Sequence, residues 1–268
     1  MAEWRQQCAG KDGWSDPAPP VRIFANVYNV GTCGITVVLI AGPRGHILLD
    51  ASTAEAAPSI AANIERLGFR LRDVKLIGAS HEHLDHVGGV AELKRRTGAT
   101  VMAMPAAFNP LETGVVLRRD PQSGSLKPFP PVQVERMLKD GMPVQLGPLR
   151  LTAHATPGHA PGGTSWTWQS CQARRCVNIV YADSVSAVSA DGYRFTDRPR
   201  YVAAFRASLN KIASLPCGLL ITPHPAASNL LERLEGKAPL IGPGQCRTYA
   251  QRGRKGLNER LASESAGR

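Results

Sequence analysis

The chain has 268 residues, 43% of them hydrophobic, which is enough to bury a substantial core in one large domain or two small ones. A formal net charge of +11 permits contact with nucleic acid or anionic surfaces, but the basic residues are dispersed, and the one dense run, 247–260, is typical of a solvated helix face. No apolar run approaches the roughly 18 residues that a membrane span needs, so we expect a soluble protein.

The N-terminal part of the chain predicts strands followed by helices. Residues 21–52 alternate β-branched apolar segments with glycine-rich turns, a pattern that predicts several strands. A helix is expected over 57–67, because Pro58 stands at its start and Gly68 at its end. The next elements expected along the chain are a strand at 74–79, a helix at 89–97 and a strand at 100–104.

The remaining chain repeats this order after an irregular stretch. Residues 105–131 are rich in Pro and Gly with weak periodicity, which predicts a long surface loop or lid. The later expected elements are strands at 143–146, 149–155, 165–169, 177–182 and 218–222, and helices near 200–215, 227–235 and 245–263. Two runs of strands, each followed by helices, predict an α/β fold in which two sheets pack face to face with helices outside.

Six cysteines, an even number, indicate disulfides. Cys171 and Cys176 flank "QARR" between two strand-like runs, as at the tip of a bridged hairpin. The chain has no C-x-x-C pair, which leaves a thiolate zinc knuckle unsupported and favours three disulfides formed in an oxidising compartment. Fifteen connectivities remain open at this point. The first ten residues do not resemble a signal peptide, so we expect that an export signal has been removed from this sequence.

The stretch "SHEHLDHVGG" follows a predicted strand and holds three of the seven histidines. It does not match H-E-x-x-H, because the fifth residue is Asp85. His81 and His83, two residues apart, lie on one side of an extended segment, whereas Asp85 and His86 begin the next turn. The motif can therefore offer two ligands to each of two adjacent metal ions.

Zinc takes about four ligands, so others must come from distant parts of the chain. His159 in "TPGHAPGG" and His224 in "ITPHPAAS" lie at strand ends framed by prolines, which hold such loops in place. The other two histidines, His46 and His154, have no such context, and His154 lies inside a predicted strand. A polar turn or a buried histidine would explain one of these residues, but five histidines at strand ends favour a metal site.

Four strings, "SHEHLDHVGG", "TPGHAPGGTSWTW", "YADSVSA" and "TPHP", resemble the metallo-β-lactamase superfamily, and most closely the third subclass of zinc β-lactamases. The HxHxDH motif marks only the superfamily, whereas the longer strings are more specific. The resemblance covers nearly the whole chain. It implies a four-layer αββα sandwich with mixed sheets, a single domain over 1–268, an N-terminal extension over 1–20, and a C-terminal helix and tail over 245–268.

The resemblance also implies roles for individual residues. The first zinc ion would be held by His81, His83 and His159, and the second by Asp85, His86 and His224. Ser184 and Ser186 would bind the substrate carboxylate, although polar residues at a strand end would also explain them. The implied disulfides are Cys8–Cys33, Cys171–Cys176 and Cys217–Cys246.

The activity implied by the resemblance is hydrolysis of the β-lactam amide bond of penicillins, cephalosporins and carbapenems, which gives antibiotic resistance. Two zinc ions roughly 3.5–4 Å apart lower the pKa of a shared water to around 7, and the bridging hydroxide, oriented by Asp85, would attack the amide. We expect a periplasmic or secreted monomer whose partner is this small-molecule substrate, with no nucleic acid and no membrane as a partner.

Three alternatives remain open. Asp183 in "YADS" falls where thioester hydrolases and lactonases of the superfamily place a metal-bridging aspartate, so a hydrolase of that kind is the strongest alternative. A nuclease would need an added domain or arm, for which no segment is evident, and a binding module would not need a complete ligand set. Glu82 is expected to be a solvated carboxylate or one that lies behind the ligands.

Overall fold

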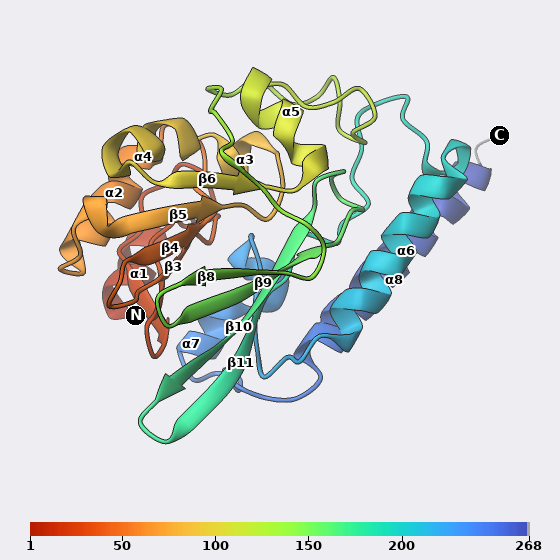
Figure 1. Cartoon of the computed structure of the whole chain (residues 1–268). Helices are drawn as coiled ribbons and strands as arrows, with labels where there is room; N and C mark the ends of the chain where they lie inside the picture. Colours follow the sequence, from red (N-terminus) through yellow and green to blue (C-terminus); the bar gives the residue numbers. More distant parts are fainter. Residues whose placement is uncertain (267–268) are drawn as a thin grey trace.

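The computed structural model describes residues 1–266, so the last two residues of the predicted C-terminal tail lie outside the described part. Two sheets stack face to face between two layers of helices (Figure 1). The first sheet contains, in spatial order, β1 (Val21–Phe24), β2 (Val27–Asn29), β3 (Val38–Ile40), β4 (His46–Leu49), β5 (Val74–Gly78), β6 (Thr100–Ala103) and β7 (Arg136–Met137). The second contains β12 (Leu219–Ile221), β11 (Arg175–Tyr181), β10 (Thr164–Gln172), β9 (Leu149–Ala155) and β8 (Met142–Leu146).

Both sheets are mixed. Strands β1 to β4 pair antiparallel and β4 to β7 parallel. In the second sheet β8 to β11 are antiparallel, and β12 joins β11 in parallel. The predicted α/β fold and αββα sandwich are therefore confirmed.

The helices form the two outer layers. Their bounds are α1 (Ala2–Cys8), α2 (Ala57–Arg66), α3 (Leu84–Val87), α4 (Val90–Thr97), α5 (Pro105–Thr113), α6 (Pro199–Ser214), α7 (Leu230–Leu234) and α8 (Gln245–Ala266). Three short 3₁₀ turns complete the set, η1 (Leu71–Asp73), η2 (Phe195–Asp197) and η3 (Pro225–Ser228). Figure 1 shows α2 and α4 against the first sheet and the long pair α6 and α8 on the opposite side. No helix in residues 1–266 is long and apolar enough to cross a bilayer.

Apolar side chains fill three layers of core. Between the sheets, Leu49, Trp166 and Tyr181 are fully buried in one cluster. A second cluster lies under α2 and α4, and a third joins the second sheet to α6 and α8. Burial of apolar surface on both faces of both sheets is the main stabilising contribution in such a sandwich.

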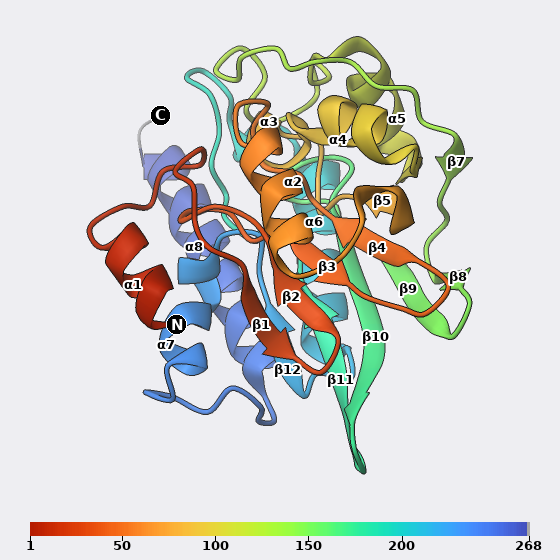
Figure 2. The same cartoon turned by 90° about the vertical axis from the view of Figure 1, so that its left-hand side faces the viewer.

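Three disulfides hold the periphery, with the pairing that the resemblance implied. Cys171 and Cys176 are directly opposite each other in the β10–β11 pair. The other two bridges are Cys8–Cys33 and Cys217–Cys246. Figure 2 shows α1 beside α7, and the buried residues of α1 pack against Leu231 and Leu234 of α7.

One sequence expectation about the fold is wrong. The stretch 105–131, predicted to be an irregular loop, begins with the helix α5. Pro105 presets the backbone of its first turn, and Gly114 ends the helix in the left-handed conformation at φ 72°. Pro105 and Gly114, two of the Pro and Gly residues that suggested a loop, thus mark the two ends of a helix.

Candidate metal centre

All six predicted ligand residues meet at one end of the two sheets. His81 and His83 follow β5, and the single turn α3 places Asp85 and His86 directly after them. His159 lies between β9 and β10, and His224 follows β12. Strands of both sheets thus end at the same place, which brings together residues up to 143 positions apart in the chain.

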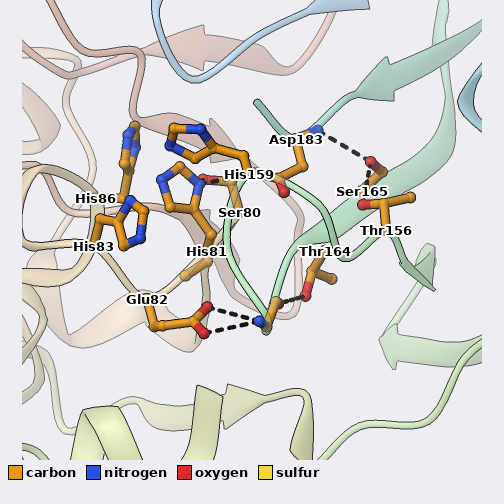
Figure 3. Close-up of polar contacts among 12 residues, drawn as sticks. Ser80, His81, Glu82, His83, His86, Thr156, His159, Thr164, Ser165 and Asp183 are labelled. Carbon is orange, nitrogen blue, oxygen red and sulfur yellow. Dashed lines mark hydrogen bonds and ion pairs between the residues drawn. The ribbon is translucent and has the colours of Figure 1, made fainter. Parts of the chain in front are cut away.

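The ligand atoms form two adjacent groups. One ligand atom from each of His81, His83 and His159 lies within 4.8 Å of the others, and the same holds for His81, Asp85 and His86. Asp85 Oδ2 is 3.4 Å from His224 Nε2 and 3.2 Å from His86 Nε2, so His224 joins the second group. Figure 3 shows the rings of His81, His83, His86 and His159 gathered around a common space.

Four of the five histidines are held from behind by an oxygen atom. His81 Nδ1 lies 2.8 Å from Asp183 Oδ1, His83 Nε2 lies 3.0 Å from Asp120 Oδ2, His86 Nδ1 lies 2.9 Å from Asp50 Oδ2, and His159 Nδ1 lies 3.0 Å from the Ser186 carbonyl. Such a partner fixes the proton on one ring nitrogen and turns the bare nitrogen toward a metal.

In two of these histidines, His81 and His86, the opposite ring nitrogen has no hydrogen bond within the described chain. His81 Nε2 and His86 Nε2 are buried and have no hydrogen-bond partner among the described residues. Buried polar atoms nearly always make a hydrogen bond, so these two nitrogens require an explanation, although His86 Nε2 also lies 3.2 Å from Asp85 Oδ2. Neutral imidazoles and a carboxylate are the donors that zinc accepts, and the residues present therefore fit a metal ion.

The charge states of the ligands also suit a cation. Burial, reinforced by the neighbouring histidines, lowers the pKa of His81 well below its usual value and that of His159 to about 3. Burial would raise the pKa of Asp85, but His86 and His224 outweigh it and hold that pKa well below the ordinary range. Burial would lower the pKa of His86, but the carboxylates of Asp85 and Asp50 raise it to about 10, so metal binding must displace a proton there.

Of the two environments expected for Glu82, the structure shows the second: the carboxylate is buried behind the ligand loop rather than solvated. Both of its carboxylate oxygens accept the Gly162 N–H, at 2.8 and 3.0 Å (Figure 3), and burial raises its pKa to about 7. Thr164 N–H also donates to the Ser80 carbonyl at 2.6 Å. A Cβ at Gly162 would lie 2.4 Å from Glu82 Oε2, 2.6 Å from Ala107 Cβ and 2.9 Å from the Ala107 backbone nitrogen, so this close approach requires glycine. Glu82 therefore ties the loop of His81 and His83 to the turn that carries His159.

Asp183 lies behind His81 and outside both groups of ligand atoms. Its side chain is fully buried, and burial raises its pKa well above the usual value. The two predicted carboxylate-binding residues follow it: Ser184 is buried, whereas Ser186 is exposed with Oγ 3.0 Å from His159 Nδ1. Ser186 thus contacts the predicted ligand His159, and the sequence did not indicate this contact.

The rim of the site contains residues that sequence reasoning missed. The Trp14 side chain is 43% exposed, with its ring 6.4 Å from that of His224. Gln122 Nε2 lies 3.3 Å from His159 Nε2 and 3.4 Å from His83 Nδ1. An acid directly after the apolar run "ILL" was the available signal for Asp50, whereas nothing local marked Asp120.

The two remaining histidines lie in strands away from the centre. The His46 ring packs edge-on against Phe69 at 4.7 Å, and His154 Nε2 lies 2.9 Å from Thr167 Oγ1. Both have ordinary structural partners, in agreement with their omission from the ligand set.

Comparisons with known proteins agree with this geometry. The metallo-β-lactamase superfamily model matches residues 30–173. The metallo-β-lactamase MIM-1 from Novosphingobium pentaromativorans is 48% identical, with a TM-score of 0.97 over 100% of this chain and 99% of that one. MEM-A1, a subclass B3 metallo-β-lactamase from a soil metagenome library, is 43% identical, with a TM-score of 0.92 over 96% of this chain and 100% of that one.

A curated relative is named for a different activity. A hydroxyacylglutathione hydrolase of Rhodopseudomonas palustris (strain BisB5) is 30% identical over 144 residues, which are 54% of this chain and 47% of that protein. The chain thus spans about half the length of this relative, but nearly all of the solved lactamase structures. Since the family model covers more than half of the sequence and the fold matches along its whole length, the chain belongs to the metallo-β-lactamase superfamily.

Proposed function

We propose that this protein is a zinc-dependent β-lactamase that opens the amide of penicillins, cephalosporins and carbapenems and so gives antibiotic resistance. The observation that carries the proposal is the set of four histidines held from behind, with the Nε2 atoms of His81 and His86 buried and without a hydrogen bond to any described residue. The similarity to structures named metallo-β-lactamases, at 43–48% identity over nearly the whole chain, supports the choice of substrate.

Two zinc ions would occupy the centre. His81, His83 and His159 would hold the first, and Asp85, His86 and His224 the second. When bound, two such ions supply a water of lowered pKa and polarise a carbonyl oxygen. Glu82 and Asp183 would hold the ligand loops in position without touching the metal.

The chain's own groups would orient the reactants. Asp85, whose carboxylate stays ionised, would accept a hydrogen bond from the attacking water and direct its lone pair toward the carbonyl carbon. Ser184 and the exposed Ser186 hydroxyl would bind the substrate carboxylate beside His159 and so place the strained amide over the centre. No nucleophilic side chain is needed in this scheme.

Thioester hydrolysis is the second candidate, favoured by the hydroxyacylglutathione hydrolases among the relatives. That activity would require Asp183 to bridge the metals. Asp183 Oδ1 instead contacts His81 Nδ1, the nitrogen opposite the unpaired Nε2, which supports a positioning role. The lactamase is therefore the better proposal.

Location and assembly follow from the same proposal. Three disulfides support an oxidising compartment, so we infer a periplasmic or secreted protein. We further infer that the protein acts as a monomer on a small substrate.

One comparison tests the proposed function. The same zinc-loaded protein would be given a carbapenem and a glutathione thioester, and its metal content would be measured. We expect carbapenem hydrolysis with close to two zinc ions per chain. Thioester cleavage with no β-lactam hydrolysis would instead assign the second candidate.

A further inference from the structure

A groove of about 1120 Å³ lies beside the metal centre and is lined by four arginines. Arg118 and Arg119 come from the segment after α5, whereas Arg198 and Arg200 come from the start of α6. All four are exposed, and none makes an ion pair with another residue in the described part of the chain. We call this feature the arginine groove.

The arginine groove has a strong excess of positive charge. Within the described chain, Asp197 is the one acid among its lining residues, and its Oδ2 lies 3.9 Å from Arg194 Nε. The N-terminus of the 16-residue helix α6 adds the positive end of its dipole to the same wall. Arg198 also lies over the ring of Tyr193, 5.9 Å from its centroid, which keeps its guanidinium at the wall. Four guanidinium groups facing one acid favour an anion.

The segments that line the arginine groove continue in the chain into residues that contact the predicted ligands. Arg119 is bonded to Asp120, the buried residue whose Oδ2 lies 3.0 Å from His83 Nε2, and adjacent Cα atoms are about 3.8 Å apart. The segment after α5 also contacts the segment that leads to α6, because Ala190 N–H donates to the Pro121 carbonyl at 2.8 Å. Ser186, four residues before Ala190 in the chain, contacts His159. The groove and the centre are therefore neighbours in the fold, as a ligand that contacts both would require.

The planar guanidinium groups suit an oxyanion with two oxygen atoms to offer, such as a carboxylate. Guanidinium groups bind carboxylates through paired, charge-assisted hydrogen bonds, which a flexible ammonium group does not match. Tyr193 and Tyr201 add aromatic faces to the lining. The groove thus combines sites for a carboxylate and for an aryl group.

We propose, on the basis of the proposed function, that the arginine groove is a binding subsite for a carboxylate on the acyl side chain of a β-lactam. The ring amide would lie at the metal centre while the side chain crosses the segment at Asp120 and reaches the groove. The protein would then prefer penicillins with an anionic side chain over otherwise identical neutral ones.

The test uses benzylpenicillin and carboxybenzylpenicillin, which share a nucleus and differ by one side-chain carboxylate. In the fourfold variant R118Q/R119Q/R198Q/R200Q we expect the KM of carboxybenzylpenicillin to rise about tenfold, with kcat nearly unchanged. The KM of benzylpenicillin should change by less than about threefold. An unchanged KM for the carboxylated substrate would overturn the proposal.

A matched control separates the groove from the overall charge. The variant R44Q/R72Q/R150Q/R174Q loses four exposed arginines from other elements and has the same net charge as the groove variant. It should leave both KM values near those of the parent. An equal rise in KM in this control would mean that long-range charge attracts the substrate and would overturn the groove as a binding site.

A binding measurement keeps this proposal separate from the proposed function. Alkali-opened forms of both penicillins cannot be hydrolysed again, so calorimetry reads their affinity even if the protein has no lactamase activity. The opened carboxybenzyl form should bind the zinc-loaded parent about tenfold more tightly than it binds the groove variant. Equal affinities would disprove the subsite. If the fourfold variant is poorly folded, the double variants R118Q/R119Q and R198Q/R200Q replace it, and each should show part of the loss of affinity.

Discussion

Two buried polar clusters lie near each other in this protein and differ in one respect. The Arg233 guanidinium, in a residue that is only 7% exposed, donates to oxygen atoms on all sides. Its acceptors are the carbonyls of Leu220, Ser228, Pro239 and Leu240 and the side chain of Gln245. Burial lowers its pKa to about 10, so it remains charged at neutral pH.

In the histidine cluster, the rings of His81 and His86 make hydrogen bonds on one side only. Oxygen atoms of Asp183 and Asp50 hold the Nδ1 atoms of His81 and His86, but the two Nε2 atoms have no hydrogen-bond partner in residues 1–266. A fully satisfied cluster such as that of Arg233 stabilises the fold, whereas a half-satisfied one costs stability unless a ligand completes it. The two clusters also cooperate, because the acceptors of Arg233 flank the strand and turn that carry His224.

Removal of the metal should have the largest effect, because it leaves the buried nitrogens of the histidine cluster without a ligand. Treatment of the zinc-loaded protein with a chelator should reduce β-lactam hydrolysis by more than about a thousandfold, and added zinc should restore it. Metal that binds only the folded state should also raise the melting temperature. Metal analysis should show preferential loss of the first zinc in His159→Ala and of the second in His224→Ala. Zinc content near zero in the intact, zinc-treated parent would contradict the metal site.

Replacement of Arg233 tests the satisfied cluster. Arg233→Met leaves several buried acceptors unpaired and should lower the free energy of unfolding by about 3–5 kcal/mol, measured by denaturant titration. Zinc held by His224 should be weakened as well. The exposed Arg72→Met is the control and should cost less than about 0.5 kcal/mol. Similar losses in both variants would mean that the Arg233 contacts contribute little.

Variants of Asp183 and of the two serines test which residues support zinc binding and which bind the substrate. Asp183→Asn should weaken zinc binding at the first site about 10–100-fold, because Asp183 orients His81, while activity at saturating zinc is largely kept. The double variant S184A/S186A should retain zinc, since the Ser186 carbonyl still holds His159, but should raise KM for carbapenems. Each lost hydrogen bond to the carboxylate should cost about 1.5–3 kcal/mol.

The opposite outcome of these two experiments would favour the second candidate function. Loss of both zinc ions in Asp183→Asn, together with an unchanged carbapenem KM in the serine variant, would indicate a bridging aspartate. Such a centre would fit the thioester hydrolase.

The smallest expected effect concerns a third cluster, around Glu264. Its carboxylate accepts hydrogen bonds from Phe195 N–H, Thr196 N–H and Arg260. Burial opposes ionisation, but Arg260 and these N–H groups outweigh it and lower the pKa of Glu264 to about 2. A carboxyl whose pKa is depressed on folding stabilises above its unfolded pKa, and this contribution is lost as the pH falls toward 2.

Glu264→Gln should therefore destabilise in a pH-dependent way. At pH 7 we expect a loss of about 1–2 kcal/mol, which shrinks as the pH falls from about 4.5 to 2. Denaturant titrations of the parent and the variant over this range check the expectation. A difference that does not change with pH would assign the effect to shape rather than charge.

Much of the metal centre could be predicted from the sequence because its ligands carry local signals. His81, His83, Asp85 and His86 lie within six residues, and prolines flank the strand-end positions of His159 and His224. The patterns of apolar residues and turn residues that predicted the strands of both sheets and the helices were likewise local in the sequence. Disulfide pairing was different, since cysteine spacing left fifteen possibilities and only the family resemblance selected one.

The partners of those ligands depended on the tertiary structure. Asp50 is 36 positions from His86, Asp120 is 37 from His83, and Asp183 is 102 from His81, so no short window of sequence contains a pair. For Glu82 the sequence left open whether the carboxylate is solvated or lies behind the ligands, because its neighbours do not reveal the glycine turn that covers it. The sequence by itself determined which side chains can bind a metal, because ligand chemistry belongs to the residue. Only the packing of the two sheets decided which nitrogen of each ring is paired with protein and which is left for a ligand, because that depends on atoms that folding brings from distant positions.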